Sequence, residues 1–122
     1  MGKQLAAEVG YKRLCLELGG NSPLIVLADA DLELAVGLAA EGAFRNSGQR
    51  CTAVKRILVE ESVRTEFTER LATRTREYTY GDPSDPDVRV GTVIDEEAAQ
   101  RLEALILDAK ARGAWVPRGR PT

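Results

Sequence analysis

Cys51 ends a polar, glycine-containing segment and is a candidate for nucleophilic chemistry. Residues 44–51 read Phe-Arg-Asn-Ser-Gly-Gln-Arg-Cys, and such a loop lets backbone N–H groups turn toward the reaction partner of the sulfur. A free thiol with a pKa of about 8.5 is mostly protonated at neutral pH, so it needs a cation or a base to activate it. Arg50 adjoins it. Buried, inert cysteines are common, so a packing role for Cys51 is the open alternative.

Glu17 is the second candidate, within the Leu-Glu-Leu-Gly-Gly segment of residues 16–20. It lies near the carboxyl end of an apolar strand predicted over residues 13–18, where open α/β sheets bind their ligands. A carboxylate in an apolar strand is costly unless it is paired or functional. The glycines that follow permit close approach by another backbone or a flat ligand. The alternative is a strand-edge glutamate that faces water.

The two segments together resemble the paired active-site signatures of the aldehyde dehydrogenase superfamily. The glutamate precedes the cysteine of Gly-Gln-Arg-Cys by 34 residues, and the resemblance runs from about residue 2 to residue 113. It implies that Cys51 attacks an aldehyde to give a thiohemiacetal, which loses hydride to nicotinamide and becomes a thioester. Glu17 would activate water to hydrolyse that thioester, and the backbone N–H of Cys51 would form half of an oxyanion hole. Leu18 and Gly19 would lie against the nicotinamide of the cofactor, NAD or NADP.

Arg50 gives the only hint of the substrate. Residues 46–56 are similar to the same run in phosphonoacetaldehyde dehydrogenases and non-phosphorylating glyceraldehyde-3-phosphate dehydrogenases. Because the forked donors of arginine suit phosphate and phosphonate, this resemblance implies that Arg50 binds an anionic group on the aldehyde. A structural arginine is the alternative, since other aldehyde dehydrogenases also carry arginine at this position.

Two rival functions stay open beside aldehyde oxidation to the acid. The first is a CoA-acylating semialdehyde dehydrogenase, in which a thiol replaces water. The presence of Glu17 favours hydrolysis instead. The second is a non-catalytic α/β remnant or interaction module.

Composition excludes several other classes of protein. The chain of 122 residues has a net charge of -2 and no histidine, which argues against a nucleic-acid groove or an anionic membrane face. Without histidine, a Ser-His-Asp or Cys-His hydrolase and a His-ligated zinc site are excluded, and no metal site is expected. Two cysteines, no signal peptide and no apolar run of membrane-spanning length predict a cytoplasmic protein.

Alternating strands and helices predict an α/β fold with a largely parallel sheet and flanking helices. The resemblance implies that this fold is part of an aldehyde dehydrogenase catalytic domain. Strands are expected over residues 13–18, 24–27 and 57–59, and helices over residues 3–9, over residues 32–44, from Ser62 onward and from Asp95 to Gly113. The apolar run at residues 24–27 predicts a strand buried on both faces. Asp29, Ser62 and Asp95 are the expected N-caps of the last three helices.

Residues 1–122 are expected to form a single, partial catalytic domain that lacks the cofactor-binding domain. The resemblance implies that the full-length enzyme binds NAD or NADP and a small-molecule aldehyde and forms a homo-oligomer. The chain by itself is expected to show no useful dehydrogenase turnover.

Overall fold

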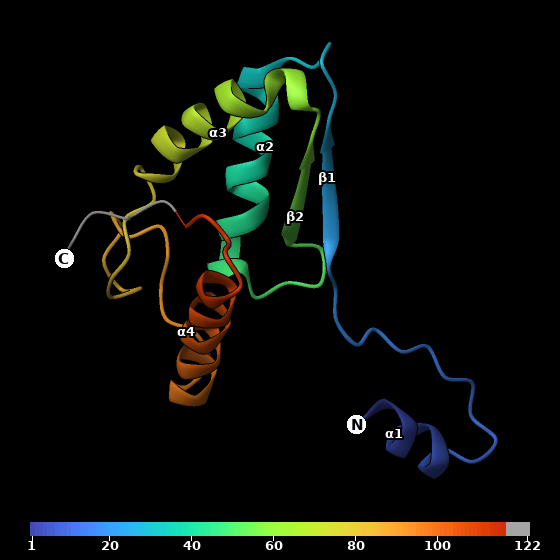
Figure 1. Cartoon of the computed structure of the whole chain (residues 1–122). Helices are drawn as coiled ribbons and strands as arrows, with labels where there is room; N and C mark the ends of the chain where they lie inside the picture. The colour runs from blue at the N-terminus through green and yellow to red at the C-terminus, as the bar shows by residue number, and fades with distance from the viewer. Residues whose placement is uncertain (117–122) are drawn as a thin grey trace. The chain divides into compact units, whose positions relative to one another are not determined.

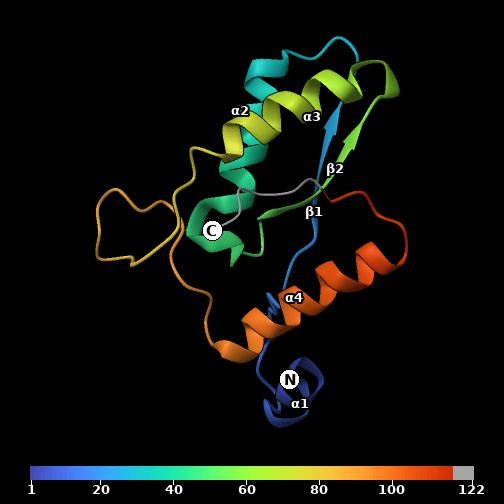
Figure 2. The same cartoon turned by 60° about the vertical axis from the view of Figure 1, so that its left-hand side comes forward.

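The computed structural model describes residues 1–116, which form two compact units divided after Gly91. The first unit contains α1 (Gly2–Glu8), β1 (Ser22–Val26), α2 (Leu32–Phe44), the 3-10 turn η1 (Arg45–Gly48), β2 (Val54–Val59) and α3 (Glu61–Thr75). The second unit contains α4 (Glu96–Ala111). Figures 1 and 2 show α2 and α3 crossing beside the two strands. The expected α/β class with parallel strands is confirmed for this two-stranded sheet.

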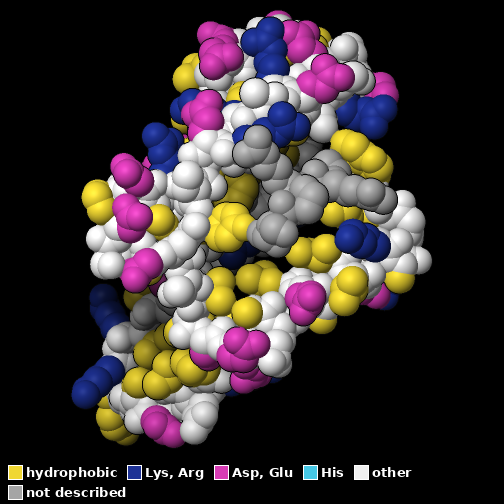
Figure 3. Space-filling model, turned by 90° about the vertical axis from the view of Figure 1, so that its left-hand side faces the viewer, with side chains coloured by type: hydrophobic (Ala, Val, Ile, Leu, Met, Phe, Trp, Pro, Cys, Tyr) yellow, Lys and Arg dark blue, Asp and Glu magenta, His cyan; other side chains and the backbone are white. Residues whose placement is uncertain are grey.

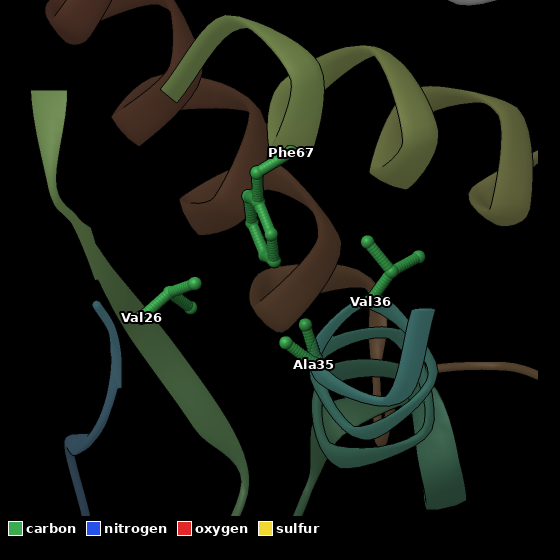
Figure 4. Packing of buried hydrophobic residues seen from close by; sticks show 5 residues of the cluster. Val26, Ala35, Val36 and Phe67 are labelled. Atoms are coloured by element: carbon green, nitrogen blue, oxygen red, sulfur yellow. The ribbon is translucent and has the colours of Figure 1, made fainter. Parts of the chain in front are cut away.

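The core lies between one face of the sheet and helices α2 and α3. The strands pair in parallel, with Leu24 opposite Ile57 and Val26 opposite Val59. Apolar side chains of alternate strand positions therefore point to the same face. The Phe67 ring of α3 points toward Val26 of β1 and toward α2 (Figure 4). Its exposed fraction is only 2%, so this ring joins all three elements.

Helix α2 has the expected bounds but a different cap. The carboxylate of Asp31, not Asp29, accepts hydrogen bonds from the backbone N–H groups of Glu33 and Leu34, at 3.0 and 3.1 Å. The prediction of Asp29 was therefore wrong. A cap must reach the second or third N–H of the helix, and only Asp31 stands directly before its first residue. Burial of α2 is also one-sided, since Leu34 remains 60% exposed.

Helix α3 begins at Glu61, two residues earlier than a cap at Ser62 would allow. Glu60 occupies the N-cap position and Ser62 lies inside the first turn, so the prediction of Ser62 as cap was wrong. The Ser62 hydroxyl instead donates to one carboxylate oxygen of Glu60 at 3.3 Å, and the other oxygen accepts the backbone N–H of Ala28 at 2.8 Å. Glu60 thus ties the chain leaving β1 to the entry of α3.

The surface of α3 carries charges of both signs. Arg64 pairs with Glu61 at 2.9 Å, one helical turn apart, and Arg70 lies 3.6 Å from Glu33 of α2. Figure 3 shows blue and magenta side chains mixed at the upper end of the molecule, where α2 and α3 lie, rather than gathered by sign. These exposed pairs contribute little to stability, because water and salt screen them.

Two sequence expectations about the sheet were wrong. Residues 13–18 run extended and exposed, and form no strand. A strand needs a hydrogen-bonding neighbour, and within residues 1–116 no third strand is available for pairing. The sheet is also covered on one face only, which leaves Ile25, Leu27 and Leu58 exposed by 64%, 56% and 54%.

Helix α4 of the second unit follows the sequence expectation closely. Asp95 accepts the backbone N–H of Ala98 at 2.7 Å, which confirms it as the cap. Gly113, with φ 87°, follows the helix end in the left-handed conformation that favours glycine. None of the helices within residues 1–116 combines the length and the apolar character that crossing a membrane requires.

Candidate active site

The loop that carries Cys51 turns back sharply on the end of α2. Asn46, Ser47 and Gly48 follow one another in the left-handed conformation, with φ of 54°, 55° and 68°. An added Cβ at Gly48 would lie 2.8 Å from the carbonyl oxygen of Ala43, so the turn admits no larger residue without a shift. Left-handed non-glycine residues cost on the order of 1 kcal/mol each and persist where the surroundings impose them, often at functional sites.

Several hydrogen bonds hold this loop. The Ser47 hydroxyl donates to the carbonyl oxygen of Gly91 at 3.3 Å. The backbone N–H of Gln49 donates to the carbonyl oxygen of Asn46 at 3.0 Å. A second turn around Cys51 is closed by the Ala53 N–H, which donates to the Arg50 carbonyl at 3.2 Å. Ala53 is buried whereas Cys51 is exposed. The loop therefore presents the thiol at the surface from an anchored backbone.

The end of α2, from which the loop departs, is itself fixed by an aromatic pair. The rings of Phe44 and Tyr78 have centroids 5.1 Å apart, and the guanidinium of Arg89 lies 5.7 Å from the Tyr78 ring centroid. The Tyr78 hydroxyl donates to Glu41 of α2 at 3.4 Å. Burial, followed by the negative charge of Glu41, raises the pKa of Tyr78 above its ordinary value.

The Glu17 segment meets the Cys51 loop at Gly20. An added Cβ at Gly20 would lie 1.6 Å from the carbonyl oxygen of Cys51, so the two backbones are in direct contact. The Ser22 hydroxyl donates to the same oxygen at 3.5 Å. Arg56 of β2 donates through Nε and Nη2 to the Asn21 carbonyl at 3.3 and 2.9 Å. The double glycine thus permits the close backbone approach that the sequence led us to expect.

Glu17, Leu18 and Gly19 lie on the exposed extended chain just before that contact. The Leu18 side chain is 61% exposed, although its Cδ1 methyl would lie 2.5 Å from a Cβ added at Gly2 of α1. An added Cβ at Gly19 would meet nothing within 4 Å. This short stretch therefore offers an apolar side chain and an open backbone face beside the loop of the thiol.

Arg50 is directed to α2. Its Nη2 donates to the carbonyl oxygen of Gly42 at 3.3 Å, within the last turn of the helix. Its Nε is buried and has no hydrogen-bond partner among residues 1–116. The structure thus gives Arg50 a structural contact, and an anion-binding role stays a prediction.

Sequence reasoning missed the residues that join the two segments. Neither Ser22 nor Arg56 was expected to join the two segments, because a serine beside a proline and a basic residue on a strand are common on surfaces. The available signal was indirect. Parallel strands β1 and β2 start at Ser22 and Val54, directly after the two segments, so pairing of the strands brings the segments together.

The chain is similar to known proteins over almost its whole length. The chain matches the aldehyde dehydrogenase family over residues 1–121. Aldehyde dehydrogenase 1A1 of Mus musculus is 46% identical over 117 residues, which are 96% of this chain and 23% of the mouse protein. The sulfoacetaldehyde dehydrogenase of Neptuniibacter caesariensis is 44% identical over 115 residues, 94% of this chain and 25% of that protein.

Solved structures show the same likeness. The aldehyde dehydrogenase from Brucella melitensis biovar abortus 2308 superimposes with a TM-score of 0.91 at 41% identity, over 97% of this chain and 25% of that one. The NADP-dependent glyceraldehyde-3-phosphate dehydrogenase from Bacillus halodurans gives 0.91 at 38% identity, over 99% of this chain and 25% of that one. The chain spans about a quarter of the length of these relatives. Its sequence and its fold both place it in the aldehyde dehydrogenase family.

Proposed function

We propose that Cys51 is the nucleophile and Glu17 the general base of an NAD(P)-dependent aldehyde oxidation, carried out by a protein that contains this chain. The observation that carries the proposal is the contact of the Gly20 backbone with the Cys51 carbonyl. It ties the segment of the base to the loop of the thiol across 31 residues of sequence. Both candidate side chains are exposed, so a substrate can reach them.

The roles of the two side chains follow from their chemistry. The Cys51 thiolate adds to the aldehyde carbon, and the new alkoxide oxygen can accept the backbone N–H of Cys51. Once this adduct is oxidised, the substrate is bound to sulfur as a thioester. Glu17 takes a proton from water, which attacks the thioester carbon, releases the carboxylic acid and restores the thiol.

The nicotinamide cofactor, when bound, supplies the acceptor for the hydride. Leu18 and Gly19 are the residues of this chain that would hold its ring, because one offers an exposed apolar side chain and the other an uncovered backbone face. The choice between NAD and NADP differs among relatives. A betaine aldehyde dehydrogenase of Staphylococcus aureus was solved with NAD+, and the Bacillus halodurans enzyme with NADP.

The proposed substrate is a class of compound, an aldehyde, and no single molecule. Relatives are named for anionic aldehydes, such as sulfoacetaldehyde, and for an aromatic aldehyde, vanillin. An anionic substrate held by Arg50 is one version of the proposal. It predicts that Arg50→Met raises KM for a phosphonate- or sulfonate-bearing aldehyde and leaves KM for a neutral aldehyde unchanged.

Acyl transfer from 4-nitrophenyl acetate tests the assignment on the 122-residue chain without requiring a cofactor. The Cys51 sulfur attacks the ester carbonyl, 4-nitrophenolate leaves and an acetyl thioester remains on Cys51. We expect Cys51→Ser to abolish release of nitrophenolate. Glu17→Gln should slow hydrolysis of the thioester by roughly 10²-fold, the lower end of general-base effects, so that the acetyl group accumulates on the Cys51 peptide in mass spectra.

The second cysteine provides the matched control, since Cys15 is also exposed. Cys15→Ser should leave both steps unchanged. Equal loss in the two serine variants would contradict Cys51 as the nucleophile and would favour a non-catalytic module. Rapid release of the acetyl group to added CoA, but not to water, would favour the CoA-acylating alternative.

A further inference from the structure

Arg50 has a contact that the proposed chemistry does not use. Its Nη2 donates to the Gly42 carbonyl at 3.3 Å, and Gly42 belongs to the last turn of α2. Carbonyls in the last turn of a helix lack a partner within the helix and carry its negative dipole end, so a cation there is favourable. The Arg50 side chain is half-buried.

The contact of Arg50 with Gly42 spans a loop whose backbone conformation is strained. Between Gly42 and Arg50 the chain passes through Asn46, Ser47 and Gly48, all left-handed, and this conformation is costly for the two residues that are not glycine. The turn that holds Cys51 begins at Arg50 itself, whose carbonyl accepts the Ala53 N–H. A side-chain contact from Arg50 to α2 therefore fixes the first residue of that turn and closes the strained loop.

The burial of the Arg50 Nε also indicates that this side chain is held in one position. An N–H group buried without a partner costs free energy, and a surface arginine with one exposed contact would avoid that cost. The side chain is thus held in place by its packing, with Nη2 on the Gly42 carbonyl.

We infer that Arg50 is a positioning residue, which clamps the nucleophile loop to the C-terminal end of α2 through the Gly42 carbonyl and thereby sets the Cys51 turn. This inference rests on the proposed role of Cys51 and, in place of the version in which Arg50 holds an anionic substrate, assigns Arg50 no contact with substrate.

Amide hydrogen exchange on the 122-residue chain measures the clamp directly. In Arg50→Met, the amides of Gln49 and Ala53 should exchange about fivefold to tenfold faster, the factor for one ordinary hydrogen bond, while α3 amides keep their rates. Lys55→Met is the matched control, because it removes an equal charge from an exposed site on β2 and should leave the loop amides unchanged. Unchanged exchange in Arg50→Met would overturn the inference.

Alkylation at Cys51 separates positioning from anion recognition. The anionic reagent iodoacetate and the neutral reagent iodoacetamide are compared, with Cys15 as internal reference. If Arg50 positions the loop, Arg50→Met changes the rates of Cys51 alkylation by iodoacetate and by iodoacetamide by the same factor. The rates in Lys55→Met correct this comparison for the loss of one positive charge. A selective loss of reactivity toward iodoacetate would overturn the inference and support an anion site.

Arg50→Lys covers the case in which Arg50→Met does not fold. Lysine keeps the charge but has a single ammonium in place of the fork, so the loop amides should exchange at rates above those of the wild type. Wild-type exchange in this variant would contradict the clamp. Exchange rates do not depend on Cys51 as a nucleophile, so failure of the acyl-transfer test and failure of this one remain distinguishable.

Discussion

At Gly20 the absence of a side chain is what allows the two chemistry-bearing segments to meet. The Cys51 carbonyl oxygen occupies the space that a Cβ would fill. Glycine at this position is therefore required by the approach of another backbone, and no rotation of a flexible side chain can relieve the clash. A Cβ added at Gly19 would meet nothing within 4 Å, so a neighbouring backbone requires glycine at position 20 but not at position 19.

Gly20→Ala should destabilise the Cys51 loop and lower acyl transfer. Forcing a methyl group against a backbone oxygen costs about 1–3 kcal/mol, and here the backbone must move. Gly37→Ala on α2 is the control, since an added Cβ there meets nothing and alanine is the better helix former by about 1 kcal/mol. Chemical denaturation of both variants measures the difference. Equal stability of the two would contradict the contact at Gly20.

The pKa of the Asp82 carboxylate reports on the hydrogen bonds of one turn, at residues 82–84. Ser84 donates its backbone N–H and its hydroxyl to the Asp82 carboxylate, at 2.9 and 2.8 Å, and these bonds lower the pKa of Asp82. Because the folded-state pKa is depressed, the contribution of Asp82 to stability is present above its ordinary pKa and is lost as pH falls through the lowered value. Ser84→Ala should move the pKa part of the way back up, because the backbone bond remains. An unchanged midpoint in a carboxyl NMR titration would contradict this.

At the scale of elements, the helix starts were the least predictable feature. The sequence offers aspartate at positions 29 and 31 before α2, and both are ordinary capping residues. Only the backbone conformation decides between them, since Asp31 has the extended geometry with φ -67° and ψ 103° that directs its carboxylate to the first free N–H groups. At α3, Glu60 fills the cap position although its carboxylate bonds elsewhere.

Asp31→Ala should lower the free energy of unfolding by about 1 kcal/mol, the usual effect of losing an N-cap. Asp29→Ala removes an equal charge two residues earlier and should change stability by less than half as much. Thermal or urea unfolding distinguishes the two. A larger loss at Asp29 would restore the sequence-based assignment of the cap.

At the scale of the whole molecule, one aromatic ring unites the elements of the first unit. Phe67 is the largest side chain that is fully buried among the described residues, and it contacts β1 and α2 from α3. The opposite face of the sheet keeps three large apolar side chains at the surface. The stability of this unit therefore depends on a small, one-sided core.

Phe67→Ala should cost about 3–5 kcal/mol, because it removes the central ring and leaves a cavity that small neighbours such as Ala35 and Ala39 cannot fill. Leu38→Ala, at a site that is 55% exposed on α2, should remain within about 0.5 kcal/mol of the wild type. Urea titration of both variants checks the contrast. A small loss at Phe67 would show that the three elements hold together without it.

The sequence by itself determined the local features. The bounds of α2 and the cap of α4 at Asp95 follow from hydrophobic period and turn chemistry, because these depend on residues close in the chain. The parallel strands were predicted from the alternation of strands and helices along the sequence. The two segments that resemble the family signatures were also readable as motifs. That they belong to one site was a hypothesis from resemblance.

Only the tertiary structure decided what depends on distant neighbours. Residues 13–18 have the pattern of a strand, but no strand of the described residues 1–116 lies beside them, so their backbone forms no sheet pairing. The contact of Gly20 with Cys51 and the direction of the Arg50 side chain toward Gly42 arise where the end of α2 and the two strands converge. Such contacts are set by the path of the whole backbone, which the spacing of residues along the chain does not contain.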